Sequence, residues 1–386
     1  MAHLSEIARE FLKLGATAYG GPATIGIMQA ELQEKRQWVT KPRFVEGLSI
    51  ANLVPGATAT QLAIFLGYVR GGWWGGLLAG LCFMLPGFAI ILALTLAYAA
   101  LGVTPILRGA LYGLGPVVIG IYAVAVYRLG KSAVSGRAQA LTAIAAGAAM
   151  LTGLIGFTMI LLLAGGVGIL LFHSRRRGAA VLAVLVIALL LAHALAPSAG
   201  AVADAEALRT PTLGALALFL FEVGAFTFGG GLTMLAFIQE QVVGQWHWLT
   251  PQEFIDGLAL GQLTPGPVLT VAAYVGYKLF GVTGAVVGTI AAFLPSFVLI
   301  LAILPVLERA RRLAWATAAM NGIGPAVIGA LAVSLARLAP YAVPDVVSFV
   351  ILIVTIVVLA LRRLGPFPLM LAGGALGVLR KAYAWR

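Results

Sequence analysis

Charged residues are scarce in this chain of 386 residues. Asp, Glu, Lys and Arg together make up 10% of the sequence, whereas 61% of the residues are hydrophobic. A soluble globule of this length needs far more charge on its surface, so the composition excludes that class and predicts a membrane protein. About 20 apolar residues suffice for one membrane-spanning helix, and uncharged runs of sufficient length occupy residues 71–107, 138–172, 178–203, 279–307 and 313–336.

Cysteine and histidine are rare as well. The single cysteine, Cys82, excludes an internal disulfide and a cysteine-based metal cluster, and the four histidines are scattered without a metal-binding spacing. Gly130-Lys131-Ser132 resembles the end of a phosphate loop, but Ala125 stands where that loop needs its first glycine. No catalytic triad or carboxylate pair stands out. We therefore expect neither an enzyme nor a bound metal or cofactor.

The net charge of +12 would suggest a nucleic-acid partner in a soluble protein. Here most Lys and Arg residues lie in short loops between apolar runs, where they set membrane topology and contact lipid headgroups. Membrane lipids are thus the expected partners of this charge, and nucleic acid is not.

A stretch of about 125 residues near the N-terminus returns about 210 residues later. Gly15–Gly21 (GATAYGG) aligns with Gly224–Gly230 (GAFTFGG), and Leu85–Phe88 (LPGF) aligns with Leu294–Phe297 (LPSF). Glycine and proline fix backbone shape, so the two halves are expected to repeat one chain path, including its breaks. Two copies of one membrane unit favour a transporter. Further aligned residues are Trp38, Thr40, Phe44, Gly47, Pro55 and Gly56, with Trp248, Thr250, Phe254, Gly257, Pro265 and Gly266.

The duplication predicts an all-α polytopic membrane protein in three parts: a first transporter repeat at residues 1–175, a connecting transmembrane segment and linker at 176–210, and a second transporter repeat at 211–386. Each repeat begins with two interrupted segments, at 10–30 and 46–69 in the first half. Full spans are expected at 72–100 and 106–128, mirrored at 281–305 and 314–336. A tight hairpin around Thr152-Gly153 is expected within 138–172, with its counterpart at 345–361 and 366–379.

Two observations predict that the second repeat is inverted relative to the first. One unmatched apolar segment, residues 179–196, separates the halves, and a single extra span reverses orientation. The first interrupted loop contains Lys35, Arg36, Lys41 and Arg43, whereas its equivalent, residues 240–256, has no Lys or Arg. Opposite charge biases indicate opposite orientations.

The breaks in the interrupted segments form the candidate substrate site. Freed backbone groups find no water in hydrocarbon, so a broken helix survives where it lines a cavity. Half-helix N-termini with free N–H groups, together with Thr hydroxyls, are a sensible cradle for an oxyanion. For any one residue the alternative is a simple kink, or a hydroxyl bonded back to its own helix. The predicted site residues are Gly20, Gly21, Pro22, Thr24, Asn52, Pro55, Gly56, Thr58 and Thr60, with Gly229, Gly230, Thr233, Gln262, Thr264, Pro265, Gly266, Pro267 and Thr270.

Lys13 and Glu222 occupy equivalent positions of the two repeats, at or within apolar segments. Ionisable residues in such segments are functional suspects. We expect the two side chains to form a coupling or charge pair near the symmetry axis or through a shared cavity; the alternative is that both are interfacial.

The Gly-Gly-Pro break at Gly20–Pro22, the Trp38–Thr40 loop, the Pro55-Gly56 break and Pro265–Pro267 resemble the chromate ion transporter family in its long, two-domain form. The resemblance covers nearly the whole chain. It implies a multi-pass protein of the bacterial inner (plasma) membrane that exports chromate and confers chromate resistance. The first half has Ala57 where the family pattern Pro-Gly-Pro ends, and the second has Gly231 where Gly-Gly-Pro ends. Because the second half keeps the complete Pro-Gly-Pro, we expect Gly266 to be more sensitive to substitution than Gly56.

Two other functions stay open at this point. One is a carrier of sulfate or another tetrahedral oxyanion, since donors arranged for chromate read shape and charge. The other is a non-transporting membrane scaffold or sensor, although a scaffold has no use for polar groups beside helix breaks. The expected partners are chromate, sulfate as an alternative anion, and membrane lipids, with a homodimer as one option for assembly.

Overall fold

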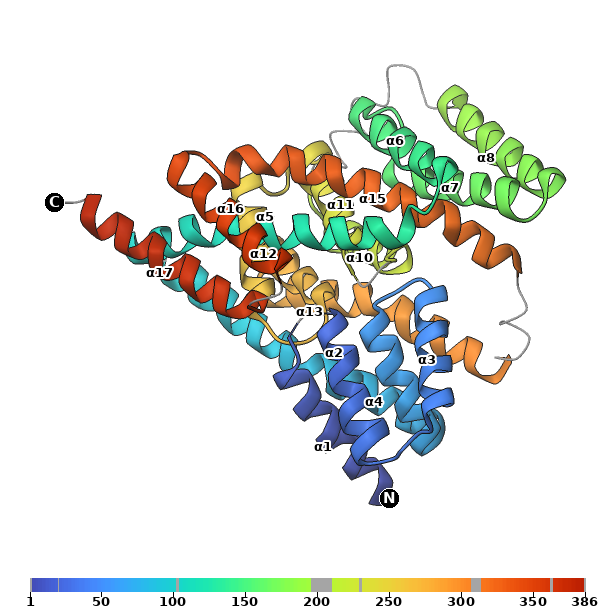
Figure 1. The fold of residues 1–386 in the computed structure, drawn as a ribbon, viewed down its shortest axis with the longest axis horizontal. Helices are drawn as coiled ribbons and strands as arrows, with labels where there is room; N and C mark the ends of the chain where they lie inside the picture. Colours follow the sequence, from blue (N-terminus) through green and yellow to red (C-terminus); the bar gives the residue numbers. More distant parts are fainter. Residues whose placement is uncertain are drawn as a thin grey trace.

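The computed structural model describes residues 2–19, 21–101, 104–195, 210–228, 231–306, 314–361 and 364–384, and these residues form helices and no strand. Figure 1 shows the arrangement of the helices. The first half consists of α1 (Ala2–Thr17), α2 (Gly21–Met28), a π-helical segment (Gln29–Lys35), α3 (Lys41–Leu53), α4 (Thr58–Leu101), α5 (Pro105–Ala133), α6 (Arg137–Thr152) and α7 (Phe157–Phe172).

The second half repeats this order after the connecting helix α8 (Arg175–Leu195). Even the π-helical segment recurs, and each is followed by a non-glycine residue in the left-handed region, Gln37 (φ 53°) or His247 (φ 54°). The predicted duplication is thereby confirmed in the backbone path. Its elements are α10 (Leu213–Ala225), α11 (Thr233–Ile238), the π-helical segment Gln239–Gln245, α12 (Pro251–Leu263), the 3-10 turn Val268–Thr270, α13 (Val271–Ile303), the 3-10 turn Leu304–Val306, α15 (Ala314–Ala342), α16 (Val346–Ala360) and α17 (Pro366–Ala384).

The interrupted segments fold as helical hairpins. A Cβ atom added to Gly47 of α3 would lie 2.3 Å from the Phe65 ring of α4, and the equivalent Gly257 faces Tyr274 at the same distance. The two helices therefore run side by side, and the break between them, Pro55-Gly56 or Pro265-Gly266, forms the tip of the hairpin. We call the hairpin of α3 with the start of α4 the first tip hairpin, and that of α12 with the start of α13 the second tip hairpin.

A second turn follows within α4 and within α13. The backbone leaves the helical region at Gly71-Gly72 and at Phe280-Gly281, where Gly72 and Gly281 have φ of 62° and 60°. Beyond each turn the chain runs back along itself, and a Cβ atom added to Gly67 would lie 2.4 Å from the carbonyl oxygen of Gly75. The spans predicted at 72–100 and 281–305 correspond to the long second legs of these helices.

Within the part of the chain that the structure describes, four helical segments are long and apolar enough to cross a membrane: α4, α5, residues 268–303 and α15. They agree with the four full spans predicted from the sequence. The predicted turn at Thr152-Gly153 is also present, because α6 ends at Thr152 and Gly153 adopts φ 65°. Helix α8 packs along α7, and its role as a connecting transmembrane segment stays a prediction.

Equivalent helices of the two repeats pack against each other in opposite directions. A two-fold axis that relates antiparallel helices runs across them rather than along them, which is the geometry of inverted repeats. The glycine contacts that set the direction are Gly76 with Leu301 and Gly80 with Phe297 in α4 and α13, and Gly115 with Ala342 and Gly130 with Ile328 in α5 and α15.

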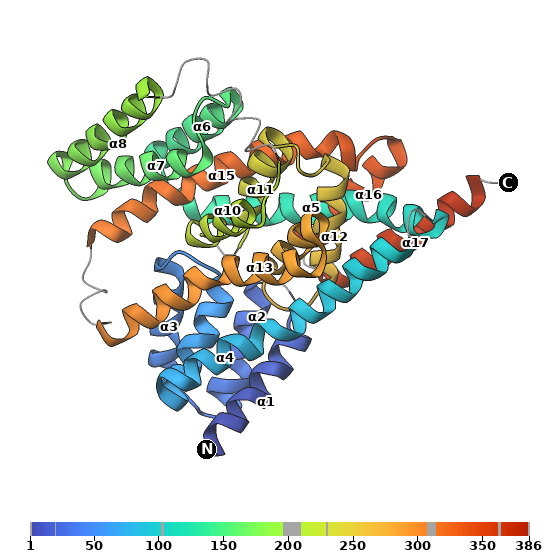
Figure 2. The same ribbon diagram turned by 180° about the vertical axis from the view of Figure 1, so that it is seen from behind.

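The repeats also exchange their last two helices. Helices α6 and α7 pack on α15 of the second half, while α16 and α17 pack on α5 of the first half (Figures 1 and 2). Backbones touch at these crossings: a Cβ atom on Gly113 would lie 1.9 Å from the carbonyl oxygen of Gly373, and one on Gly322 would lie 2.0 Å from that of Ala164. The two halves therefore complete each other through their last two helices, and the exact boundaries at residues 175 and 211 stay a prediction.

Candidate functional site

The first tip hairpin meets the second half at the centre of the fold. Gly56 adopts φ 135°, a conformation that favours glycine. Its N–H donates to the carbonyl oxygen of Thr227 at 2.7 Å, and the next N–H, of Ala57, donates to the hydroxyl oxygen of Ser296 at 2.9 Å. The break at Pro55-Gly56 is thus held by the break between α10 and α11 and by α13.

The second tip hairpin meets the first half in the same way. Gly266 adopts φ 99°, and its N–H donates to the carbonyl oxygen of Ala18 at 2.8 Å, just before α2 begins at Gly21. The structure therefore brings the predicted breaks together in two pairs. The break at Gly56 meets the one at Thr227, and the break at Gly266 meets the one after Ala18. Gly20, Gly229, Gly230 and the side chain of Pro22 lie outside the described residues.

Most Thr hydroxyls of the second half are bonded to their own segment. Thr233 donates to the carbonyl oxygen of Phe228 at 2.6 Å, Thr264 to that of Leu260 at 2.8 Å, and Thr270 to that of Pro267 at 2.9 Å. For these three residues, the alternative stated above, a hydroxyl bonded back to its own segment, holds in this conformation. Pro265 and Pro267 are buried around them.

The first half keeps polar atoms unpaired beside its tip. The Thr60 hydroxyl and the Gln61 carbonyl oxygen Oε1 are fully buried and have no hydrogen-bond partner, while Gln61 Nε2 donates to the carbonyl oxygen of Pro55 at 2.7 Å. Thr58, which begins α4, is buried beside them. An unpaired buried hydroxyl is costly, so these atoms mark the place where a ligand gains most from binding.

The remaining predicted residues have other surroundings. Thr24 is buried and has a polar partner. Asn52 is exposed, so its amide does not belong to the buried cluster. Gln262 is half-buried next to the Tyr122 hydroxyl of α5, which is itself buried without a hydrogen-bond partner. Ser296 was not predicted as a site residue. Its counterpart in the first half is Gly87, which has no side chain, so the aligned pair indicated only a shared backbone shape.

The predicted pair of Lys13 and Glu222 makes no direct contact, because each side chain has another partner. Lys13 Nζ lies 3.5 Å from Glu31 Oε1, and Glu222 accepts a hydrogen bond from the Thr158 hydroxyl. Lys13 points along its own hairpin to the π-helical segment, while Glu222 meets α7. The repeat relation made the two positions equivalent, but equivalent positions need not touch.

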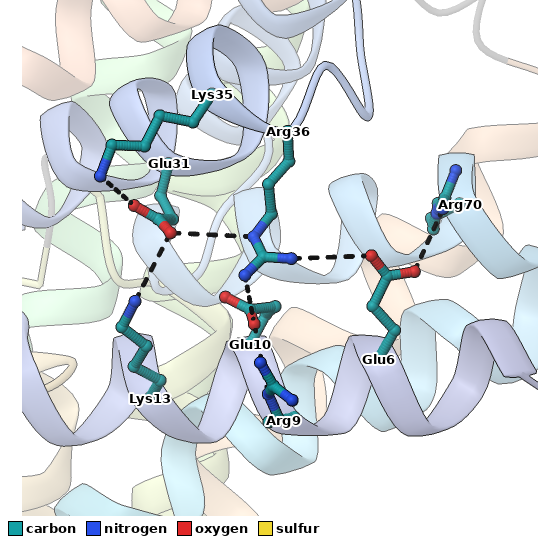
Figure 3. Close-up of polar contacts among 8 residues, drawn as sticks. All are labelled: Glu6, Arg9, Glu10, Lys13, Glu31, Lys35, Arg36 and Arg70. Carbon is teal, nitrogen blue, oxygen red and sulfur yellow. Dashed lines mark hydrogen bonds and ion pairs between the residues drawn. The ribbon is translucent and has the colours of Figure 1, made fainter.

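Lys13 belongs instead to an ionic cluster that fastens α1 to the first π-helical segment and to α4 (Figure 3). Arg36 Nη2 lies 2.7 Å from Glu10 Oε1, and Arg70 Nη2 lies 3.1 Å from Glu6 Oε2. The hydrogen bond from Arg70 holds the pKa of the Glu6 carboxyl below its ordinary value. Arg70 lies at the far end of the first tip hairpin from Pro55-Gly56. The ionic cluster is therefore away from the first tip.

A cavity of about 620 Å³ lies along α12 rather than between the tips. Its wall includes Tyr98 of α4, Arg108 and Tyr112 of α5, Asp256 of α12, and Lys278 of α13. Sequence reasoning missed this cavity, because its wall comes from six helices whose proximity no local pattern reveals. At the tips themselves, backbone groups of the two halves are bonded to each other.

Comparisons with known proteins agree with the duplication. The family model described as chromate transporter matches residues 5–171 and, a second time, residues 214–378. The chain is 33% identical to a chromate transport protein of Cupriavidus metallidurans, over 97% of this chain and 92% of the relative. It is 33% identical to a probable chromate transport protein of Synechococcus elongatus (92% and 89%) and 34% identical to a chromate transport protein of Pseudomonas aeruginosa (88% and 83%). No solved structure gives a significant match.

Proposed function

The chain belongs to the chromate transporter family, and on that premise we propose that it exports chromate across the inner membrane, binding the anion where the two tip hairpins meet the opposite half. The observation that supports this most is the exchange of backbone hydrogen bonds at the centre, from Gly56 to Thr227 and from Gly266 to Ala18. These four residues belong to breaks in four separate segments, and each bond crosses between the repeats.

A dehydrated dianion must recover strong hydrogen bonds on entering the protein. Backbone N–H groups at the start of α4, with the Thr60 hydroxyl, supply donors there, and residues 54–61 contain no Lys or Arg. Without a fixed positive charge the anion is also released readily. When chromate takes the Gly56 N–H, the bond to Thr227 is lost, so binding frees the two halves to move.

The site is expected to be unequal in the two halves. Ser296, Thr60 and Gln61 surround the first tip, whereas the corresponding positions at the second tip are Gly87, Thr270 and Val271. Since Thr270 donates to Pro267, whereas the equivalent Thr60 hydroxyl has no partner, the first tip keeps a free donor that the second tip lacks. We place the anion there.

Removal of single hydroxyl groups tests whether Thr60 binds the anion or only packs against its neighbours. Thr60→Val removes the unpaired hydroxyl with little change of shape, and one hydrogen bond to a charged group is worth about 1.5–3 kcal/mol. We expect chromate uptake by everted vesicles to fall by roughly 10- to 100-fold, while Thr270→Val, which removes a locally bonded hydroxyl, changes it little. Wild-type uptake by Thr60→Val vesicles would remove this site.

Sulfate provides the second arm of the same assay. Donors that read a tetrahedral dianion do not distinguish chromium from sulfur, so sulfate should compete with chromate. If wild-type vesicles accumulate sulfate but not chromate, the protein is a sulfate carrier. If they accumulate neither anion, it is a scaffold or sensor and the proposal fails.

A further inference from the structure

Asp256 is a buried carboxylate in the wall of the cavity. Only 5% of the residue is exposed. Its Oδ2 accepts a hydrogen bond from the Tyr98 hydroxyl at 3.1 Å, and its Oδ1 accepts one from Gln252 Nε2 at 3.0 Å. Both donors are neutral, so neither oxygen of this carboxylate is held by a cation.

The charged groups nearest to Asp256 are already engaged. Lys278 of α13 lies 2.7 Å from Glu253 of α12, one turn before Asp256. Tyr274 of α13 donates to the backbone oxygen of Glu253 at 2.7 Å. The negative charge of Glu253 thus adds to the burial of Asp256 in disfavouring a second ionised carboxylate.

The other ionisable groups of the cavity come from α5, α15 and α17. Tyr112 donates to Asp345 at 2.6 Å. Arg108 and Tyr341 are exposed, and Lys381 is half-buried. They face the same cavity as Asp256 without an ion pair to it.

The first repeat treats the equivalent carboxylate differently. Glu46 corresponds to Asp256, because Phe44 and Gly47 align with Phe254 and Gly257. Arg43 Nη1 lies 2.6 Å from Glu46 Oε2, and the residue that replaces Arg43 in the second repeat is Glu253. In the first repeat the carboxylate of Glu46 is paired with Arg43, whereas in the second repeat Asp256 has only neutral hydrogen-bond donors.

Helix α12 lies outside the four candidate spans, and burial raises the pKa of the Asp256 carboxyl above its ordinary value. A carboxyl with a raised pKa holds its proton to higher pH than an exposed one, and the cavity gives water access to it.

We propose that Asp256 is a proton-binding site and that the cavity along α12 is the route by which protons reach it, so that anion transport is coupled to proton movement. This inference rests on the proposed function. On release, the proton passes from the carboxyl oxygen to water in the cavity and leaves a carboxylate. That carboxylate attracts Lys278 away from Glu253.

The geometry links this event to the second tip. Asp256 lies in α12, and Lys278 lies in the first leg of α13 just before the turn at Phe280-Gly281. These are the two legs of the second tip hairpin, which ends at Pro265-Gly266. A change of ion pairing between the legs therefore alters the hairpin whose tip bonds to Ala18.

The test uses the full chain in proteoliposomes, with radiolabelled chromate as the probe and the membrane potential clamped at zero. We expect a pH gradient to change the initial rate of wild-type uptake at least several-fold. Asp256→Asn should transport at one rate with or without the gradient, and Glu46→Gln should keep the wild-type response. A gradient response in Asp256→Asn equal to that of the wild type would overturn the inference.

A second measurement keeps the inference separate from the proposed function. Infrared difference spectra of the purified protein over a pH series should show a titrating carboxyl band that Asp256→Asn removes. Tyr98→Phe, which deletes a donor to the ionised form, should move the midpoint of that band to higher pH. Absence of the band refutes the proton site even if chromate is carried, while its presence with no chromate uptake refutes only the chromate assignment.

Discussion

Single residues at the two tips are equivalent in sequence and unequal in surroundings. A Cβ atom on Gly56 would lie 2.5 Å from both Ser296 Oγ and Gln61 Nε2, whereas the nearest atom to a Cβ on Gly266 is the carbonyl oxygen of Gly15 at 3.6 Å. From the sequence, Gly266 is expected to be the more sensitive position because its Pro-Gly-Pro motif is complete. The structure predicts that Gly56 is the more sensitive position. Whether a motif is complete does not reveal which residues of the other repeat lie beside it.

Alanine at each tip tests this order. Both substitutions strain a left-handed backbone, but Gly56→Ala adds an overlap that costs about 1–3 kcal/mol. We expect Gly56→Ala to lower the Tm of the detergent-solubilised protein and the rate of chromate transport more than Gly266→Ala. An equal or larger loss in Gly266→Ala would restore the ranking from the sequence.

Backbone breaks can be predicted from single residues, whereas side-chain partners cannot. The positions of the breaks could be predicted, because Gly and Pro act on their own backbone. The partners of Lys13 and Glu222 could not, because Glu31 and Thr158 become neighbours only after hairpins fold. The buried setting of Asp256 could not be predicted either, because its hydrogen-bond donor Tyr98 is far away in the sequence and on another helix.

At the scale of elements, glycine decides how closely helices approach. The long helices α4 and α13 fold back at Gly71-Gly72 and Phe280-Gly281, and the returning legs touch through glycine pairs. The sequence predicted the spans but not these turns, since an uncharged run reads the same whether the chain continues or reverses. The end of α6 and the start of α15 were easier to predict, because a left-handed glycine lies beside one and a loop of charges beside the other, whereas α15 continues past the predicted end at residue 336 to Ala342.

A glycine at one of these crossings should therefore be irreplaceable. A Cβ atom on Gly276 would lie 2.1 Å from the carbonyl oxygen of Gly284, while nothing lies within 4 Å of one on Gly214. We expect Gly276→Ala to destabilise the protein by about 1–3 kcal/mol, seen as a lower Tm by size-exclusion after heating. Gly214→Ala, in the helix α10, should leave the Tm unchanged or raise it. A tolerated Gly276→Ala would mean that the two legs are not in contact.

The whole molecule is organised by the antiparallel packing of its equivalent helices. The sequence predicted inversion from the parity of spans and from loop charge, and the opposite directions of α4 with α13 and of α5 with α15 agree with it. The exchange of α6–α7 and α16–α17 between the repeats was not predicted, because a duplicated sequence is equally compatible with two separate bundles.

Inversion in the membrane has a direct test. Glu34 and Gly244 are equivalent, exposed residues of the two π-helical segments. In a Cys82→Ala background, Glu34→Cys and Gly244→Cys should react with a membrane-impermeant maleimide from opposite sides of sealed vesicles. Reaction of both from one side would contradict the inversion. Gln37 and His247 are less suitable positions, since their left-handed backbone disfavours cysteine.

The exchanged hairpins also dictate an order of events during synthesis. When the ribosome has completed residues 1–175, α5 is in place but the helices that cover it, α16 and α17, do not yet exist. Helices α6 and α7 must wait in the bilayer until α15 emerges. The first half alone therefore leaves its glycine-lined surfaces uncovered, and α5 gains its full cover only when Pro366–Ala384 docks on it. A nascent chain that stalls between the repeats exposes these surfaces to whichever membrane protein lies nearby, which makes it a natural substrate for quality control.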